Sequence, residues 1–321
     1  MERNNVCSNN NILVSVICNT YNQEDYIADA LESFLMQRTN FGFEVLVHDD
    51  ASTDRTADII KEYEREYPGI IKPVYRTENL YSRNIPNGQI ERARGKYIAI
   101  CEGDDYWIDP DKLQKQVDLL EKHPLCDVCA HSAYVVNAET KKRIGNISPR
   151  NNSGIIEVKD VIEGGGGFVA TNSLVVRKSF YDKPPQFRQF YQIDYSLQIA
   201  ASLRGGMLYL PDYMSAYRYM AKSSWTSRMH TDPTKYCITM DKLVTMLQKL
   251  EQETDGKYGK SIEIMIRKYT VSKLEAQENY KEIISNYRDV IKYKPLKSKI
   301  LLYLKAYFPL VQRIRNWRRN G

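Results

Sequence analysis

The chain has 321 residues, of which 42% are hydrophobic and 27% are charged, and its net charge is +6. These proportions are typical of a soluble globular protein, and no run approaches the ~20 apolar residues of a membrane-spanning helix. The six cysteines lack the spacing of a disulfide framework, and the first residues lack the apolar stretch of a signal peptide. We therefore expect a cytoplasmic protein with reduced thiols.

The first third of the chain alternates strand-like and helix-like segments. Short continuous apolar runs predict strands that are buried on both faces, and apolar residues at helical spacing predict helices between them. The alternation favours right-handed crossovers and a parallel sheet. The predicted strands are 12–18, 43–50, 71–76 and 97–101, and the predicted helices are 26–35, 52–67, 87–94 and 110–123.

Polar residues follow three of these predicted strands: 19–21, 49–50 and 102–105. Ligands of parallel sheets bind beyond the carboxyl ends of the strands, so we expect the three segments to share one cleft. In the last segment, Glu102, Asp104 and Asp105 are crowded together. Carboxylates that repel one another and lose water on burial indicate a cation among them, and Mg²⁺ typically binds together with phosphate.

The rest of the chain changes character twice. Residues 125–215 mix short strand-like segments with a glycine run at 164–167, and long helical segments follow residue 233. Apolar residues that recur every seven positions in 280–293 predict a helix–helix packing seam.

The basic charge of the chain lies in its C-terminal tail. Nine basic residues and no acidic ones follow Asp289. Residues 294–320 mix these cations with aliphatic and aromatic side chains, which favours binding to an anionic membrane surface. A cationic helix packed on its own domain is the alternative. No nucleic-acid-binding motif accompanies the charge, so we expect no nucleic-acid partner.

Three motifs, in this order and spacing, resemble those of the family 2 glycosyltransferases. They are VSVICNTYN (14–22), VLVHDDASTDRT (45–56) and EGDDYWIDPDKLQKQ (102–116). The resemblance covers about residues 11–225 and implies a GT-A fold, an α/β nucleotide-binding sandwich with a mostly parallel central sheet. We place this domain at 1–230, with a nucleotide half (11–110) and an acceptor half (111–230), before a helical region at 231–321.

The resemblance also implies roles for single residues. Asp50 matches the residue that accepts a hydrogen bond from the base, and Asp104 and Asp105 match the metal and ribose carboxylates of the DxD region. Glu102 stands at the first position of that region and is one methylene longer than aspartate. The other residues that match nucleotide contacts are Thr20, Tyr21, Asn22, Arg83 and Asn84.

An acceptor hydroxyl needs a base to remove its proton, and in the family this base lies well downstream of the metal motif. Asp194 occupies the matching place, which predicts a single displacement with inversion at the anomeric carbon. Mg²⁺ or Mn²⁺ would neutralise the leaving diphosphate. Four further residues are weaker candidates: Trp107 and, near the acceptor pocket, Thr171 and Asn172, with His230 for the metal shell.

The leading interpretation is a metal-dependent glycosyltransferase that uses a UDP-sugar and a glycan or lipid-linked acceptor in bacterial surface-polysaccharide synthesis. A lipid-linked acceptor fits a place at the inner face of the plasma membrane. Nucleotidylyl transfer to a sugar phosphate is the first alternative, although the turn at 19–23 lacks the glycines of that class. The second is a non-catalytic membrane-associated binding module, which would have no need to keep the carboxylates.

Overall fold

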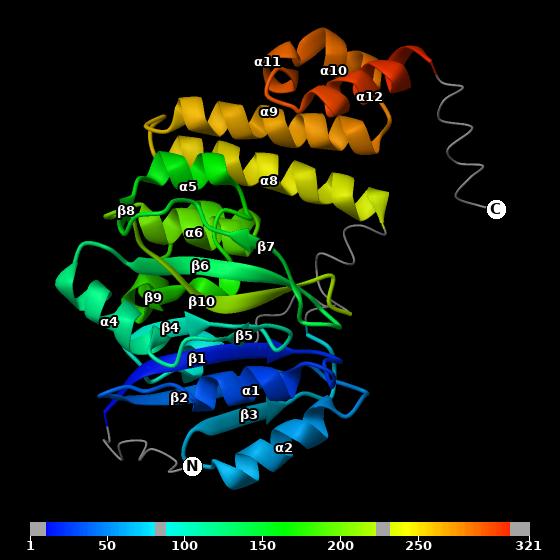
Figure 1. Ribbon diagram of the computed structural model, residues 1–321. Coiled ribbons are helices and arrows are strands. Elements are labelled where there is room, and N and C mark those ends of the chain that lie inside the picture. The colour runs from blue at the N-terminus through cyan, green and yellow to red at the C-terminus, as the bar shows by residue number, and fades with distance from the viewer. Residues whose placement is uncertain (1–10, 81–87, 223–231, 309–321) are drawn as a thin grey trace. The chain divides into compact units, whose positions relative to one another are not determined.

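The computed structural model describes residues 11–80, 88–222 and 232–308. The chain forms two compact units, residues 1–185 with 193–227, and residues 186–192 with 228–321. The first unit combines helices with a sheet, and the second is helical (Figure 1). In the described parts of the chain, no helix is both long enough and apolar enough to cross a bilayer.

A ten-stranded sheet forms the centre of the first unit. Its strands are β1 (Ile12–Thr20), β2 (Gly42–Asp49), β3 (Ile71–Tyr75), β4 (Tyr97–Ile100), β5 (Tyr106–Trp107), β6 (Val128–Asn137), β7 (Arg143–Ile147), β8 (Gly154–Ile156), β9 (Val175–Arg177) and β10 (Met207–Tyr219). The strand order is β3-β2-β1-β4-β9-β6-β10-β5, with β7 beside β6 and β8 beside β10. The long pairings β1–β2, β1–β4, β2–β3 and β6–β10 are parallel, which confirms the expected fold class.

Helices cover both faces of this sheet. They are α1 (Ile27–Leu35), α2 (Thr56–Glu66), α3 (Gln89–Arg92), α4 (Lys112–Lys122), α5 (Val158–Gly164) and α6 (Asp194–Ser202), with 3₁₀ turns η2 (Thr171–Ser173) and η3 (Lys178–Asp182). Side chains alternate along β1, so Val14 and Val16 pack with α1, α2 and α4, whereas Ile17 packs with α3 on the opposite face. Helix α6 packs against β6 and β10.

The predicted strands of the first third match the observed ones closely, and helix starts differ. Helix α2 begins at Thr56, four residues after the expected start, because the Asp54 carboxylate accepts the Thr56 N–H at 2.9 Å and holds the preceding residues in a turn. Such a local side-chain bond competes with the helix for the same backbone donor.

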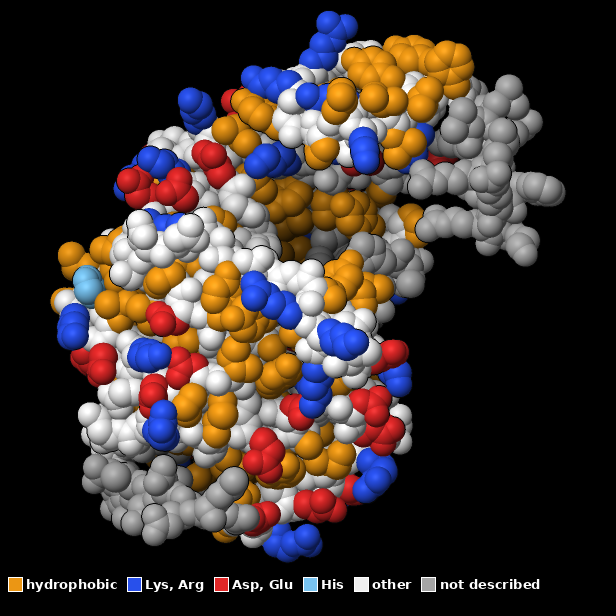
Figure 2. Space-filling view, viewed as in Figure 1, with side chains coloured by type: hydrophobic (Ala, Val, Ile, Leu, Met, Phe, Trp, Pro, Cys, Tyr) orange, Lys and Arg blue, Asp and Glu red, His pale blue; other side chains and the backbone are white. Residues whose placement is uncertain are grey.

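The second unit has its own apolar core. It contains η4 (Gln186–Phe190), α8 (Pro233–Glu253), α9 (Gly259–Ala276), α10 (Tyr280–Asn286), α11 (Arg288–Ile291) and α12 (Leu296–Tyr307). The seam expected at 280–293 is present, since Tyr280, Ile283 and Ile291 are buried in this core, but the helix is interrupted at Tyr287. Figure 2 shows hydrophobic side chains gathered on the outer face of α12.

Gly95 allows β1 and the segment before β4 to approach closely. Its N–H donates to Ser15 Oγ at 2.9 Å, and a Cβ built on it would lie 2.5 Å from Ser15 N and 2.7 Å from the Val14 carbonyl carbon. These are backbone atoms that cannot rotate away. The position therefore requires glycine for space.

We predict that Gly95→Ala lowers the free energy of unfolding by about 1–3 kcal/mol, because the added methyl group separates two backbone segments. Gly69→Ala is the control, since its Cβ would meet no atom within 4 Å. Urea denaturation of the two variants measures the difference. Equal stability of the two variants would contradict the close approach at Gly95.

Candidate active site

The acidic turn that follows β4 is bound to the end of β1. The Gly103 N–H donates to the Asn19 carbonyl at 2.9 Å, and Asn19 Nδ2 lies 3.4 Å from Glu102 Oε1. A Cβ at Gly103 would lie 2.6 Å from Gln23 Oε1 and 2.8 Å from Thr20 Oγ1. The glycine between the acidic residues thus lets the turn lie directly on the β1 loop, as the convergence of strand ends predicts.

Asp105 is buried, and each of its carboxylate oxygens accepts a hydrogen bond from the protein. The Arg218 N–H donates to Oδ1 at 2.8 Å, and Asn172 Nδ2 donates to Oδ2 at 2.9 Å. Burial raises the pKa of Asp105 and the nearby Asp104 carboxylate raises it further, while these hydrogen bonds oppose the shift. Asp105 therefore ties the acidic turn to β10 and to η2.

Asn172 is itself fixed by hydrogen bonds to both its side chain and its backbone. Ser215 Oγ donates to its side-chain oxygen at 2.6 Å, and Trp107 Nε1 donates to its backbone carbonyl at 2.9 Å. Trp107 is buried and packs edge-on against Phe34, with 4.7 Å between ring centroids. The Trp107 side chain thus lies in the core and supports Asn172, and its role as a site residue stays a prediction.

Arg218 is fully buried and was missed by the sequence analysis. Its Nη1 donates to the Asp104 carbonyl at 2.8 Å, and its Nη2 forms an ion pair with Asp29 on α1. The guanidinium lies over the rings of Tyr106, at 4.5 Å from the centroid, and Tyr26, at 5.1 Å. An arginine inside the strand-like segment 207–219 is the one sequence signal that points to it.

Asp104 is half-buried and lies between Gly103 and Asp105, both of which are hydrogen-bonded to other segments. Burial raises its pKa, and the Arg218 charge opposes the shift. For Glu102, burial and then the negative charges of Asp194 and Asp104 raise the pKa to about 8. Mutual repulsion of this kind is relieved by a cation.

Asp194 is connected to this turn through η2, and its negative charge helps to raise the pKa of Glu102. It is the first residue of α6, its side chain is exposed, and its carboxylate accepts a hydrogen bond from the Thr171 hydroxyl. Thr171 and Asn172 are neighbours in η2. One short turn therefore contacts both Asp194 and Asp105, and it brings the two together across 89 residues of sequence.

The loops after β1 and β2 are joined next to the turn. The Asp50 N–H donates to the Thr20 carbonyl at 3.0 Å, and Asn22 accepts the Thr53 N–H at 2.8 Å with a left-handed backbone (φ 51°). Asp50 Oδ1 accepts the Leu80 N–H at 2.7 Å. The structure thus brings the segment of Thr20, Tyr21 and Asn22 together with Asp50.

His48 lies beside Asp50, with His48 Nε2 3.5 Å from Asp50 Oδ1. Burial lowers the pKa of His48, and the neighbouring Asp50 carboxylate opposes this shift. Three other candidates from the sequence, Arg83, Asn84 and His230, lie outside the described residues.

The carboxylates of the acidic turn suit a metal ion whose remaining ligands come from a bound substrate. Among the described residues, no three or more His, Cys, Asp or Glu side chains are grouped as a complete metal site. Glu102 and Asp104 offer carboxylate oxygens with raised pKa at one turn. Mg²⁺ commonly binds one or two carboxylates and takes its remaining ligands from phosphates and water. The donor set therefore fits a metal bound together with a phosphorylated ligand.

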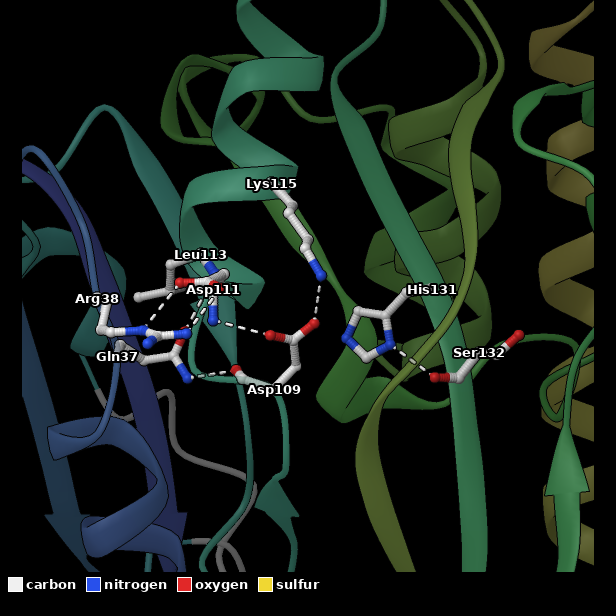
Figure 3. A network of polar contacts seen from close by, with 8 residues as sticks. All are labelled: Gln37, Arg38, Asp109, Asp111, Leu113, Lys115, His131 and Ser132. Carbon is white, nitrogen blue, oxygen red and sulfur yellow. Dashed lines mark hydrogen bonds and ion pairs between the residues drawn. The ribbon is translucent and has the colours of Figure 1, made fainter.

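Figure 3 shows how the segment after the acidic turn fixes the start of α4. Gln37 Nε2 donates to the Asp109 carbonyl at 2.9 Å, and Gln37 Oε1 accepts the Leu113 N–H at 3.1 Å. The Asp109 carboxylate accepts the Asp111 N–H at 2.8 Å and pairs with Lys115 Nζ at 2.6 Å. The helix is thus anchored to the end of α1 by a side chain distant in sequence.

Lys112, in the first turn of α4, is buried behind Trp107. Its Nζ lies 4.1 Å from the Trp107 ring centroid and donates to Gln116 Oε1 at 2.8 Å. Burial lowers the pKa of Lys112 to about 7. The ring and the amide oxygen offset only part of the cost of burying the ammonium.

The chain is similar in sequence to proteins of a known family. The model of the family described as Glycosyl transferase family 2 matches residues 15–218. An uncharacterised protein of Mycobacterium tuberculosis is 38% identical over 224 residues, which are 70% of this chain and 63% of that protein. The putative teichuronic acid biosynthesis glycosyltransferase TuaG of Bacillus subtilis is 42% identical over 108 residues, 34% of this chain and 42% of TuaG. The chain thus spans under two thirds of these relatives.

Two solved structures are similar in fold. TarS 1–349 of S. aureus in complex with UDP-GlcNAc has a TM-score of 0.60 at 16% identity and covers 92% of this chain and 79% of that one. The mannosyltransferase PcManGT of Pyrobaculum calidifontis, in complex with GDP-Man and Mn²⁺, has a TM-score of 0.52 at 17% identity, over 96% and 83% of the two chains.

We predict that the stability of the protein depends on pH through Lys112. Its pKa is about 7 in the folded chain and roughly 10.4 in the unfolded chain, so between these values the unfolded chain binds the extra proton. The free energy of unfolding of the wild type should then rise with pH relative to Lys112→Met, by up to about 1.4 kcal/mol per pH unit.

Urea denaturation at about pH 7 and about pH 9 measures this difference. Lys122→Met, at an exposed position in the last turn of the same helix, is the control: it keeps Lys112, so its difference in stability from wild type should be the same at both pH values. If the Lys112→Met and wild-type stabilities change in parallel with pH, Lys112 does not carry the pH dependence.

Proposed function

The chain belongs to glycosyl transferase family 2, and from this premise we propose that it is an inverting transferase that uses a UDP-sugar and a divalent metal. One observation carries the proposal. The acidic turn after β4 and the carboxylate of Asp194 share one site, because η2 contacts Asp194 through Thr171 and Asp105 through Asn172. A metal-binding turn and a base next to each other are what glycosyl transfer from a nucleoside diphosphate needs.

We assign the metal-facing role to Asp104. Asp105, which the motif resemblance also implies as a ligand, has both oxygens engaged by Arg218 and Asn172, and its role is to orient the turn. Glu102 adds negative charge beside Asp104. Mg²⁺ or Mn²⁺, when bound, would neutralise the charge that develops on the leaving diphosphate.

The nucleotide would lie over the ends of β1 and β2. Thr20, Tyr21 and Asn22 would pack against the uracil and ribose, and Asp50 would accept a hydrogen bond from the base. The Leu80 N–H bond to Asp50 Oδ1 supports this assignment, because it fixes the orientation of the carboxylate. Arg83 and Asn84 remain assigned to the nucleotide by their motif positions alone.

Asp194 would act as the base. The acceptor hydroxyl gives its proton to the Asp194 carboxylate while its oxygen bonds to the anomeric carbon, and the bond from that carbon to the diphosphate oxygen breaks. Attack from the face opposite the leaving group inverts the anomeric configuration. The hydrogen bond from Thr171 orients the carboxylate at the start of α6.

The acceptor would be a glycan or a lipid-linked saccharide in bacterial surface-polysaccharide synthesis. The names of TuaG and of a poly(ribitol-phosphate) beta-glucosyltransferase, which is 34% identical over 95 residues, support this choice. Since TarS and PcManGT were solved with a UDP-sugar and a GDP-sugar respectively, the uracil preference rests on the motif resemblance. A lipid-linked acceptor fits a cytoplasmic protein placed at the inner face of the plasma membrane.

We predict that Asp194→Asn lowers kcat for sugar transfer by about 10²–10⁴-fold, because the amide cannot accept the proton of the acceptor. The Kd for UDP should stay within about twofold, since the base does not contact the nucleotide. Release of UDP from UDP-GlcNAc and other UDP-sugars in the presence of acceptor glycans measures the rate, and calorimetry measures the Kd.

Asp160→Asn is the matched control, because Asp160 is also an exposed carboxylate in the first turn of a helix, α5. It should transfer sugar at the wild-type rate. Full activity of Asp194→Asn would show that another residue is the base, and retention of anomeric configuration in the product would contradict single displacement.

A further inference from the structure

Helix α12 is apolar on two opposite faces. On the inner face, Leu302 and Ala306 are buried in the core of the second unit. On the outer face, Leu296 is 71% exposed, Ile300 52% and Tyr307 55%. A helix with an apolar outer face in addition to its core contact is normally covered on both sides.

The outer side chains form one continuous stripe along the helix. Leu296, Ile300, Tyr303 and Tyr307 follow at intervals of three or four positions, which places them on one side of the helix, and Leu304 and Phe308 directly follow the last two. Together with Lys299 these side chains line an open groove. Figure 2 shows this apolar surface over α12 with lysine and arginine side chains around it. The stripe consists of Leu296, Ile300, Tyr303, Leu304, Tyr307 and Phe308.

The charged side chains of this helix all have one sign. Lys297, Lys299 and Lys305 lie on α12, which carries no acidic residue, and none follows Asp289 in the sequence. Lys297 is exposed, and Lys299 reaches back to the Lys292 carbonyl at 2.7 Å. Lys305 instead donates to the Tyr280 hydroxyl at 3.2 Å and lies over that ring. A surface that covers the stripe must therefore bury apolar side chains next to lysines that have no carboxylate partner on this helix.

We propose that α12 docks on an anionic lipid surface, with the stripe among the upper acyl chains and with Lys297 and Lys299 at the headgroups. An apolar face flanked by lysines is the arrangement by which interfacial helices bind anionic bilayers, and tyrosines favour the boundary between headgroups and chains. The helix is about 18 Å long, well short of the ~30 Å hydrocarbon layer, so it lies on the surface.

The inference deepens the proposed location at the membrane and does not depend on the proposed chemistry. A second copy of the chain fits the stripe less well. Contact between two copies of α12 would bring lysines of both together, and neither helix has a carboxylate to pair with them. Anionic headgroups supply that charge.

The test is sedimentation of the full chain with vesicles of phosphatidylglycerol and phosphatidylcholine in equal parts, compared with pure phosphatidylcholine. Wild type should bind the anionic vesicles more strongly. Ile300→Ser/Tyr307→Ser should lower the partition coefficient at least about tenfold, because two apolar side chains no longer enter the bilayer. Lys297→Gln should lower it about fivefold, from roughly 1 kcal/mol per cation.

Ile238→Ser is the matched control, since Ile238 on α8 is similarly exposed (49%) and lies outside the stripe, and it should bind like wild type. Equal binding by the double variant and wild type, or equal binding to both vesicle types, would overturn the proposal. A wild-type dimer without vesicles that the double variant dissociates would assign the stripe to a second copy. Release of UDP from a soluble donor should be the same in all variants, so its loss would concern the proposed chemistry instead.

Discussion

The candidate site depends on how one buried carboxylate, that of Asp105, is satisfied. A carboxylate without partners inside a protein is strongly unfavourable, so its neighbours must supply hydrogen bonds. Here the Arg218 N–H and the Asn172 amide do so, and both come from segments far away in the sequence. Satisfying Asp105 therefore requires that β10, η2 and the acidic turn assemble together, which leaves Asp104 half-buried at the turn.

The same constraint connects the part of the site that we propose for the nucleotide to the part that we propose for the acceptor. Asn172 contacts Asp105, and its neighbour Thr171 contacts Asp194, so a shift of η2 would move the acidic turn and the proposed base together. Arg218 adds a second connection, because it binds the Asp104 carbonyl and also Asp29 on α1. Rigid placement of a base relative to a leaving group is a large part of catalytic rate, which gives these contacts a functional meaning.

The sequence predicted the strands of the first third and the meeting of their polar ends, because both follow from local apolar runs and from the rule for parallel sheets. It did not predict the contacts of Arg218, which lies 113 residues from Asp105. The residues next to an arginine in an apolar strand do not indicate which distant group it will contact. The break at Tyr287 was missed for a related reason. The seven-residue spacing indicates which side chains are buried, but it does not show that the helix is continuous, and α10 and α11 bury these side chains as two separate helices.

The metal-binding role of the acidic turn is tested most directly by calorimetry of UDP binding with Mn²⁺, with Mg²⁺ and with chelator. The proteins compared are wild type, Asp104→Asn and the control Asp118→Asn, which changes an exposed carboxylate on α4. We expect metal to strengthen UDP binding to wild type and to Asp118→Asn, whereas Asp104→Asn should lose this enhancement and still bind UDP without metal. The same enhancement in Asp104→Asn, or none in wild type, would contradict the assignment of the acidic turn to a metal–diphosphate site.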